Sequence, residues 1–175
     1  MAGSIDIPEL GDELSVGVAA LRARGVSEKR LRARTLARPF RGIRAEAVEP
    51  TIAGRARQYA PRLRPGQAIG GAAGAALWGM PLPDWCDEAP VTVVVQRGAH
   101  RPRTDGIESI SLVEGRFTVQ RLDDLPVTSP ILTLCTLART LDLDALIVVA
   151  DALMAPRERY PRLRFPRPAA TPERL

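Results

Sequence analysis

The chain has 175 residues, of which 25 are basic and 20 acidic, and its formal net charge is +5. This length provides for one or two small domains with a buried core. One histidine and two cysteines, with no CxxC or HxxxH spacing, argue against hydrolytic triads and zinc sites. We therefore expect a protein that is not an enzyme, with no catalytic residue, no metal and no cofactor.

The N-terminal residues give no secretion signal, because the first 21 carry four acids and no base. The longest uncharged run, residues 67–83, is rich in Gly and Ala and shorter than a spanning helix needs. Cys86 and Cys135 are far apart in sequence and indicate no disulfide framework. We expect a cytoplasmic protein without a membrane partner.

The first predicted helix spans about residues 12–24, where apolar side chains recur at helical spacing. Its N-cap is Asp12 or Ser15, and a glycine ends it. Ser27 is a favoured N-cap for a second helix over about 28–36, with an acid in its first turn. The tight Gly-Val-Ser link between the two resembles a helix-turn-helix.

The positive charge is concentrated between residues 22 and 44, where nine bases and one acid give a local net charge of +8. Residues 45–155 carry a net −3 instead. Pro39 ends the second helix, and residues 40–44 indicate a strand or wing. A basic helix before a small basic wing is how winged-helix modules meet a DNA backbone. We expect these side chains on DNA phosphates: Lys29, Arg30, Arg32, Arg34, Arg41 and Arg44. The alternative is a solvated, arginine-rich helix with no partner, because arginine is abundant throughout the chain.

The middle of the chain predicts a third helix over about residues 51–59 and a loop after it. Residues 70–77, GGAAGAAL, lack the GK[ST] ending of a P-loop and follow no predicted strand, so we expect a closely packed helix. The β-branched run 91–95 is the clearest strand. Two more strands, 107–113 and 117–122, are expected to form a hairpin through Glu114-Gly115, and a turn at Asp123-Asp124 follows, with a short strand at Val127.

Two helices complete the predicted core. Ser129 caps the first, with Pro130 at its first position, and Asp142 or Asp144 caps the second, which runs to about Met154. Their expected buried faces are Ile131, Leu134, Cys135, Ala138 and Leu141, then Leu146, Val149, Ala150 and Leu153. Trp78 and Trp85 flank a proline-rich segment, where we favour burial over a ligand platform.

Three segments resemble a family of actinobacterial proteins: GVSEKRLRAR with RPFRGIRA, AAGAALWGMPLP, and LPVTSPILTLCTLARTLDLDALIVVADALM. The chain is similar over about residues 14–155 to AbiEi-type antitoxins of type IV toxin–antitoxin systems, which often carry a C-terminal very-short-patch-repair-like endonuclease domain. Many relatives have a Ser-His pair where this chain has Gly70-Gly71. The resemblance implies a DNA-binding or regulatory half without the catalytic endonuclease domain, and a cognate toxin as its partner.

We expect an α+β fold with a winged-helix-like domain over residues 1–48, an AbiEi-like domain of three or four strands and two C-terminal helices over 49–155, and a Pro/Arg-rich disordered tail or linker over 156–175. The expected function is an antitoxin-like transcriptional regulator that binds double-stranded DNA. One alternative is the non-catalytic N-terminal portion of a truncated very-short-patch-repair-like endonuclease, as the resemblance implies. A restriction-type nuclease core is absent in its usual form, because the lone lysine, Lys29, has Ser27 and no acid two positions before it. The other alternative is a module that neutralises a toxin without contacting DNA.

Overall fold

A five-stranded mixed sheet is the centre of the fold. The computed structural model describes residues 10–11, 13–113, 115–156 and 158–165. In chain order its elements are β1 (Val16–Gly17), α1 (Val18–Ala23), α2 (Glu28–Leu31), β2 (Ile43–Arg44), α3 (Ile52–Tyr59), the 3-10 turn η1 (Ala60–Arg62), β3 (Gln67–Gly70), α4 (Gly71–Trp78), the 3-10 turn η2 (Asp84–Glu88), β4 (Val91–Gln96), β5 (Ile107–Leu112), β6 (Val119–Leu122), β7 (Leu125–Thr128), α5 (Pro130–Leu137) and α6 (Leu143–Met154).

The strands are ordered β5-β4-β3-β7-β6. β4 pairs parallel to β5 and antiparallel to β3, while β7 pairs parallel to β3 and antiparallel to β6. The expected hairpin between residues 107–113 and 117–122 is therefore wrong, because β5 and β6 lie at opposite edges. The true hairpin joins β6 to β7 through Asp123 and Asp124, whose positive φ values of 50° and 63° form the predicted turn.

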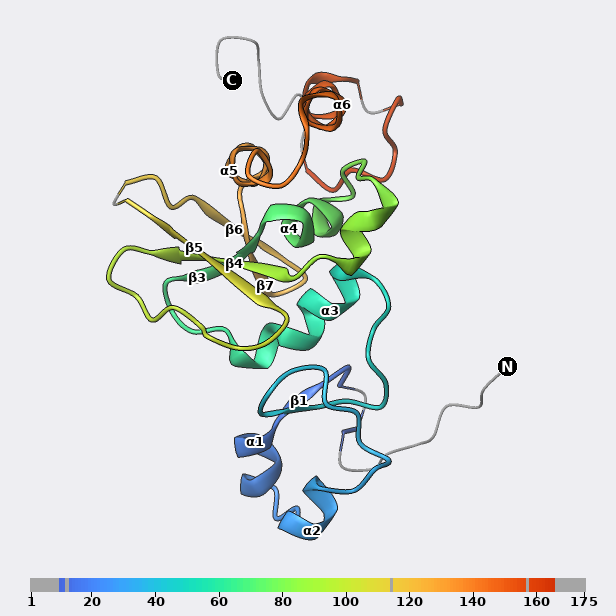
Figure 1. The fold of residues 1–175 in the computed structure, drawn as a ribbon, viewed down its shortest axis with the longest axis vertical. Coiled ribbons are helices and arrows are strands. Elements are labelled where there is room, and N and C mark those ends of the chain that lie inside the picture. Colours follow the sequence, from blue (N-terminus) through green and yellow to red (C-terminus); the bar gives the residue numbers. More distant parts are fainter. Residues whose placement is uncertain (1–9, 12, 114, 157, 166–175) are drawn as a thin grey trace.

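The helices lie on two sides of this sheet. Figure 1 shows α4, α5 and α6 on the side away from the N-terminal elements, with α3 between the sheet and those elements. The first strand after α3, β3, was not predicted; its four residues are all buried, and α4 follows it directly. The fold is mixed α/β, with a sheet one strand larger than the sequence indicated.

The glycines of β3 and α4 serve close packing, as expected. The Gly71 N–H donates to Thr136 Oγ1 at 3.0 Å, and a Cβ on Gly74 would lie 3.3 Å from the Ile69 carbonyl oxygen. The interpretation that residues 70–77 follow no strand is wrong. The start of α4 is nevertheless buried beneath α5, so it offers no open phosphate loop.

Side-chain caps fix the helix starts that local sequence predicted. Thr51 Oγ1 accepts from Gly54 N at 3.1 Å, Ser129 Oγ from Leu132 N at 3.3 Å and Asp142 Oδ1 from Ala145 N at 2.9 Å. The buried face of α5 differs from the expected one, since Cys135 and Ala138 are exposed. Thr133 and Thr136 are buried in their place because their hydroxyls bond to the Thr128 and Thr133 carbonyls.

The N-terminal elements are shorter than predicted. The first helix begins only at Val18, because Val16 and Gly17 pair with Arg44 and Ile43 as a two-stranded sheet. The second ends at Leu31, although Ser27 is its N-cap as expected, its Oγ accepting from Arg30 N at 3.3 Å. These elements enclose a small core of their own, formed by Leu10, Val16, Leu21, Leu31 and Leu36.

Residues 158–165, expected to belong to a disordered tail, pack onto the larger core. Leu163 and Phe165 are buried, and the Phe165 ring meets Trp78 edge-on at a centroid distance of 5.9 Å. Arg164 N donates to the Trp78 carbonyl at 2.9 Å, and its guanidinium forms two hydrogen bonds with Asp123. The prediction for 166–175, like that for 1–9, falls outside the described residues.

Candidate nucleic-acid interface

The basic stretch folds into a small hairpin after α2. Ala37 and Ala45 exchange both backbone hydrogen bonds, at 2.9 and 3.2 Å, and the loop between them carries Arg38, Arg41 and Arg44. Its returning limb, β2, pairs with β1, and Val18 N donates to the Gly42 carbonyl at 2.8 Å. The predicted strand or wing is thus a basic loop closed on both sides by backbone bonds.

Phe40 anchors the tip of this hairpin to the rest of the molecule. Its side chain is buried in the larger core, together with Ile43, although both lie within the range expected for the N-terminal domain. The ring meets Tyr59 of α3 at a centroid distance of 5.1 Å. A Cβ on Gly106 would lie 3.4 Å from Phe40 Cε1, which places the β4–β5 loop beside the same ring. The charged tip is therefore fixed against the sheet.

Four of the six predicted DNA-contacting side chains are exposed and available. They make no hydrogen bond or ion pair with any part of the chain that the structure describes: Lys29, Arg32, Arg34 and Arg41. Arg30, the fifth, is half-buried and donates from Nη1 to Thr35 Oγ1 at 3.0 Å. The available charge lies on α2, on the turn that follows it and on the hairpin tip.

Arg44, the sixth, has a structural contact that the sequence did not indicate. Its Nε donates to the Leu31 carbonyl at 2.8 Å and its Nη1 to the Ile43 carbonyl at 2.8 Å, so it ties the end of α2 to β2. Burial, followed by the positive charge of Arg38, holds the pKa of Arg44 below its ordinary value. The charge on Arg44 is largely committed to holding the hairpin in place.

Acidic partners reduce the local positive charge only slightly. Arg22 Nε donates to Glu28 Oε1 at 2.6 Å, and this bond lowers the pKa of Glu28. Arg24 Nη2 pairs with Glu13 Oε1 at 2.5 Å. Because Glu13 lies outside residues 22–44, counting it takes the local net charge from +8 to +7.

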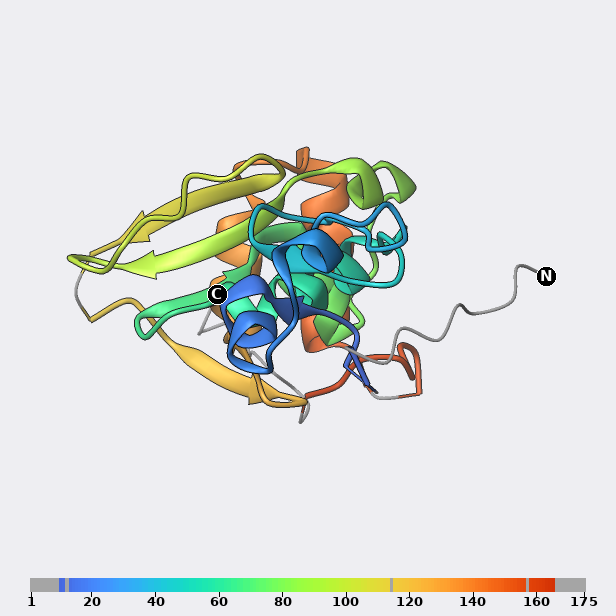
Figure 2. The same ribbon diagram turned by 90° about the horizontal axis from the view of Figure 1, so that it is seen from below.

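The β4–β5 loop adds basic groups to this surface that sequence reasoning missed. Arg38 and Arg41 of the hairpin and Arg103 of this loop line a notch of about 250 Å³. The other residues around it are Pro39, Phe40, Thr104 and Asp105. Figure 2 shows the loop and the N-terminal part side by side. The run QRGAHRPR at 96–103 was visible as a basic loop, but nothing local placed it beside the hairpin.

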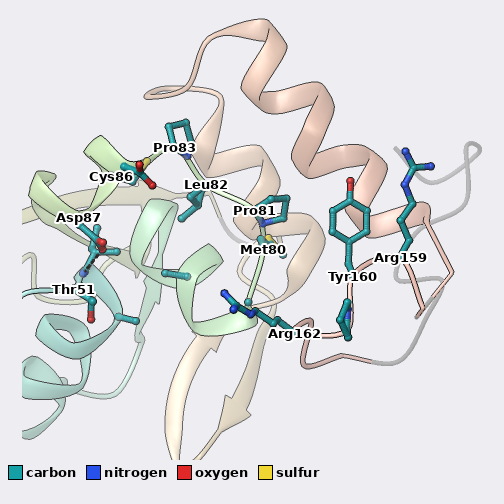
Figure 3. Close-up of a pocket in the computed structure, with 16 residues that line it drawn as sticks. Thr51, Met80, Pro81, Leu82, Pro83, Cys86, Asp87, Arg159, Tyr160 and Arg162 are labelled. Atoms are coloured by element: carbon teal, nitrogen blue, oxygen red, sulfur yellow. Dashed lines mark hydrogen bonds between the residues drawn. The ribbon is translucent and has the colours of Figure 1, made fainter.

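A larger pocket than the notch lies elsewhere, between the start of α3, residues 80–83 and residues 159–162. Its volume of about 580 Å³ falls in the range of small-molecule sites. Figure 3 shows the Arg162 guanidinium extending toward the end of α4, whereas Arg159 lies on the far side of Tyr160. Asp87, on the opposite wall, already accepts the Ile52 N–H at 2.8 Å.

The thiol that lines this pocket is poorly placed to act as a nucleophile. Cys86 is buried, and burial followed by the Asp87 charge raises the pKa of its thiol, which disfavours the nucleophilic thiolate. Throughout the described ranges, no cluster of three His, Cys, Asp or Glu side chains could hold a metal ion.

Trp78 is buried as expected, with Nε1 donating to the Thr128 carbonyl at 2.9 Å, but Trp85 is 49% exposed, contrary to the prediction.

α6 presents an apolar stripe to solvent. Leu143, Ile147 and Met154 recur at helical spacing and are 72%, 55% and 38% exposed, with Val148 beside them at 48%. Its opposite side packs inward through Val149, Ala152 and Leu153, two of which the sequence predicted.

Comparisons with protein-family models, curated proteins and solved structures find no match to this chain. Each of its described helices is too short or too polar to cross a lipid bilayer.

Proposed function

We propose that this protein is a cytoplasmic, antitoxin-like transcriptional regulator that binds double-stranded DNA through α2 and the 37–45 hairpin. In this proposal α1, α2 and the hairpin act as a winged-helix-like module. The observation that carries it is the set of four exposed cations without partners: Lys29, Arg32, Arg34 and Arg41. Arg41 lies on the hairpin that Phe40 anchors, so its charge is presented on a fixed surface.

The expected contact is chiefly with phosphates. Arginine and lysine release counterions from DNA when they neutralise its backbone, so affinity falls steeply as salt rises. α2 has only four residues, and the cations are divided between it, the following turn and the hairpin. Such an arrangement positions the protein on a duplex, while sequence preference requires contacts with base edges. We therefore expect strong salt dependence and modest discrimination among sequences.

A mobility-shift experiment tests the proposal. Wild-type protein at micromolar concentration and low salt should retard duplex DNA, and the double variant K29E/R34E should not. The matched control is R139E, which reverses an exposed charge just after α5, on the far side of the sheet. Unretarded DNA with the wild type, or equal retardation by K29E/R34E, would contradict the proposal.

The second candidate is a module that neutralises a toxin, favoured by the apolar stripe of α6. An exposed apolar stripe of this kind marks a surface for a partner protein. Co-expression with the product of a neighbouring gene should give a stable complex with wild type and none with I147E. A complex that forms equally with I147E would remove α6 from this role.

A further inference from the structure

We propose that the notch between the hairpin and the β4–β5 loop holds one phosphate group, clamped by Arg38, Arg41 and Arg103. The source of this phosphate is the DNA backbone, so the inference rests on the proposed function above and adds the sheet to the interface. The β4–β5 loop, which belongs to the net acidic part of the chain, then becomes a second contact region.

Convergence of charge from two distant parts of the sequence is the first argument. Arg38 and Arg41 come from the hairpin, and Arg103 comes from a loop more than 60 residues later. Arg41 and Arg103 are exposed and make no hydrogen bond or ion pair with the described chain. Placing guanidinium groups together without an anion is unfavourable, and a phosphate between them removes that repulsion.

Hydrogen bonds and packing contacts within the protein hold the walls of the notch in place. Arg38 Nη2 donates to the Arg32 carbonyl at 2.9 Å, which orients its fork and leaves other N–H groups for a ligand. Phe40 lies beneath the hairpin tip and beside Gly106, whose carbonyl accepts the Val91 N–H at 2.9 Å. The walls are therefore fixed to the sheet before any ligand binds.

Size and charge select the ligand. A volume of about 250 Å³ lies below the range of about 300–1,000 Å³ typical of pockets for drug-sized molecules, and suits a single small group. Asp105 also lines the notch, so three guanidinium groups and one carboxylate give a net +2. Asp105 has no hydrogen bond or ion pair to these arginines within the described residues, so it leaves their donors available. Phosphate oxygens match the planar donor forks of arginine.

The test uses the full chain, a labelled duplex and a series of salt concentrations read by fluorescence anisotropy. R103Q should lower the affinity at low salt and reduce the magnitude of the slope of log K against log salt by up to about 0.9, the value for complete loss of the clamped phosphate. The control R139Q also removes one exposed guanidinium, but far from the notch, and should leave the slope unchanged. Circular dichroism confirms that both variants fold.

A second measurement separates the notch from the function. In an NMR titration with inorganic phosphate, the Nε–Hε signals of Arg38, Arg41 and Arg103 should shift together in the wild type. In R103Q the signals of Arg38 and Arg41 should not shift. If DNA binds and R103Q behaves as R139Q does, the clamp is wrong while the function stands. If DNA does not bind but phosphate shifts these signals, the clamp stands and its DNA source is wrong. Failure of both measurements overturns both claims.

Discussion

Phe40 meets Tyr59 edge-on, with ring centroids 5.1 Å apart and an interplanar angle of 73°. One ring comes from the tip of the basic hairpin and the other from the end of α3, and both are buried. Edge-to-face pairs stabilise beyond the area that they bury. Through this contact, the most positively charged part of the chain is fixed to the part that contains the sheet.

Removing the Phe40 ring should destabilise the protein and loosen the hairpin. F40A is expected to cost about 3–5 kcal/mol, the usual range for a buried phenylalanine. F40L keeps a large apolar side chain and should cost clearly less. Denaturant unfolding followed by circular dichroism measures both, and an F40A midpoint equal to that of the wild type would show that the tip is not anchored.

Replacement by methionine should affect mainly stability at Arg44 and mainly DNA binding at Arg41. R44M loses two charged donors to backbone carbonyls and should lower the free energy of unfolding by about 1–3 kcal/mol. R41M should change stability by less than about 0.5 kcal/mol, because this exposed side chain contributes no internal bond. In DNA titrations R41M should have the larger effect of the two, reducing the magnitude of the slope of log K against log salt more than R44M does. A stable R44M protein would refute the structural role.

The ion pair between Asp123 and Arg164 predicts a pH-dependent stability. The hydrogen bond from Arg164 lowers the pKa of Asp123 in the folded state, so the unfolded chain binds protons more readily. The contribution is present above the ordinary aspartate pKa of about 4 and is lost as the pH falls through the lower folded value. Thermal midpoints of wild type and D123N should differ at neutral pH and converge in acid. A difference that persists at the lowest pH would argue against this origin.

Substitution of Gly79 tests whether residues 158–165 pack against the end of α4. It ends α4 with φ of +75°, and a Cβ there would collide with the backbone carbonyl of Arg162. G79A should therefore destabilise by more than the roughly 1–2 kcal/mol that a left-handed conformation costs an ordinary residue. G98A is the control, since Gly98 also has positive φ (+86°) but has no atom within 4 Å of a Cβ. Equal losses in the two variants would mean that the docked segment contributes nothing at Gly79.

Helix caps and the β-branched run predicted much of the secondary structure, because these features act within a few residues. Ser27, Ser129 and Asp142 cap helices as the sequence indicated, and the 91–95 run is a strand. Strand order was not predictable in this way. β3 was missed because its four residues end in a glycine and continue directly into a glycine-rich helix. The separation of β5 from β6 depends on pairings across the sheet, which no short stretch encodes.

The candidate interface was predictable as a concentration of charge but not as a geometry. The sequence identified all six cations, yet it could not tell that Arg44 bonds to backbone carbonyls while Arg41 stays available. Nor could it place Arg103 beside Arg38, since that proximity depends on the burial of Phe40 next to Gly106. Charge is a property of composition, whereas its availability depends on tertiary contacts.

The salt dependence of duplex binding by the wild-type protein tests the central claim most directly. Titrations by fluorescence anisotropy between about 50 and 200 mM salt give the slope of log K against log salt. With four to six cations on phosphates, that slope should be about −3.6 to −5.4. Absence of binding at the lowest salt, or an affinity that does not change with salt, would contradict the assignment of this surface to DNA.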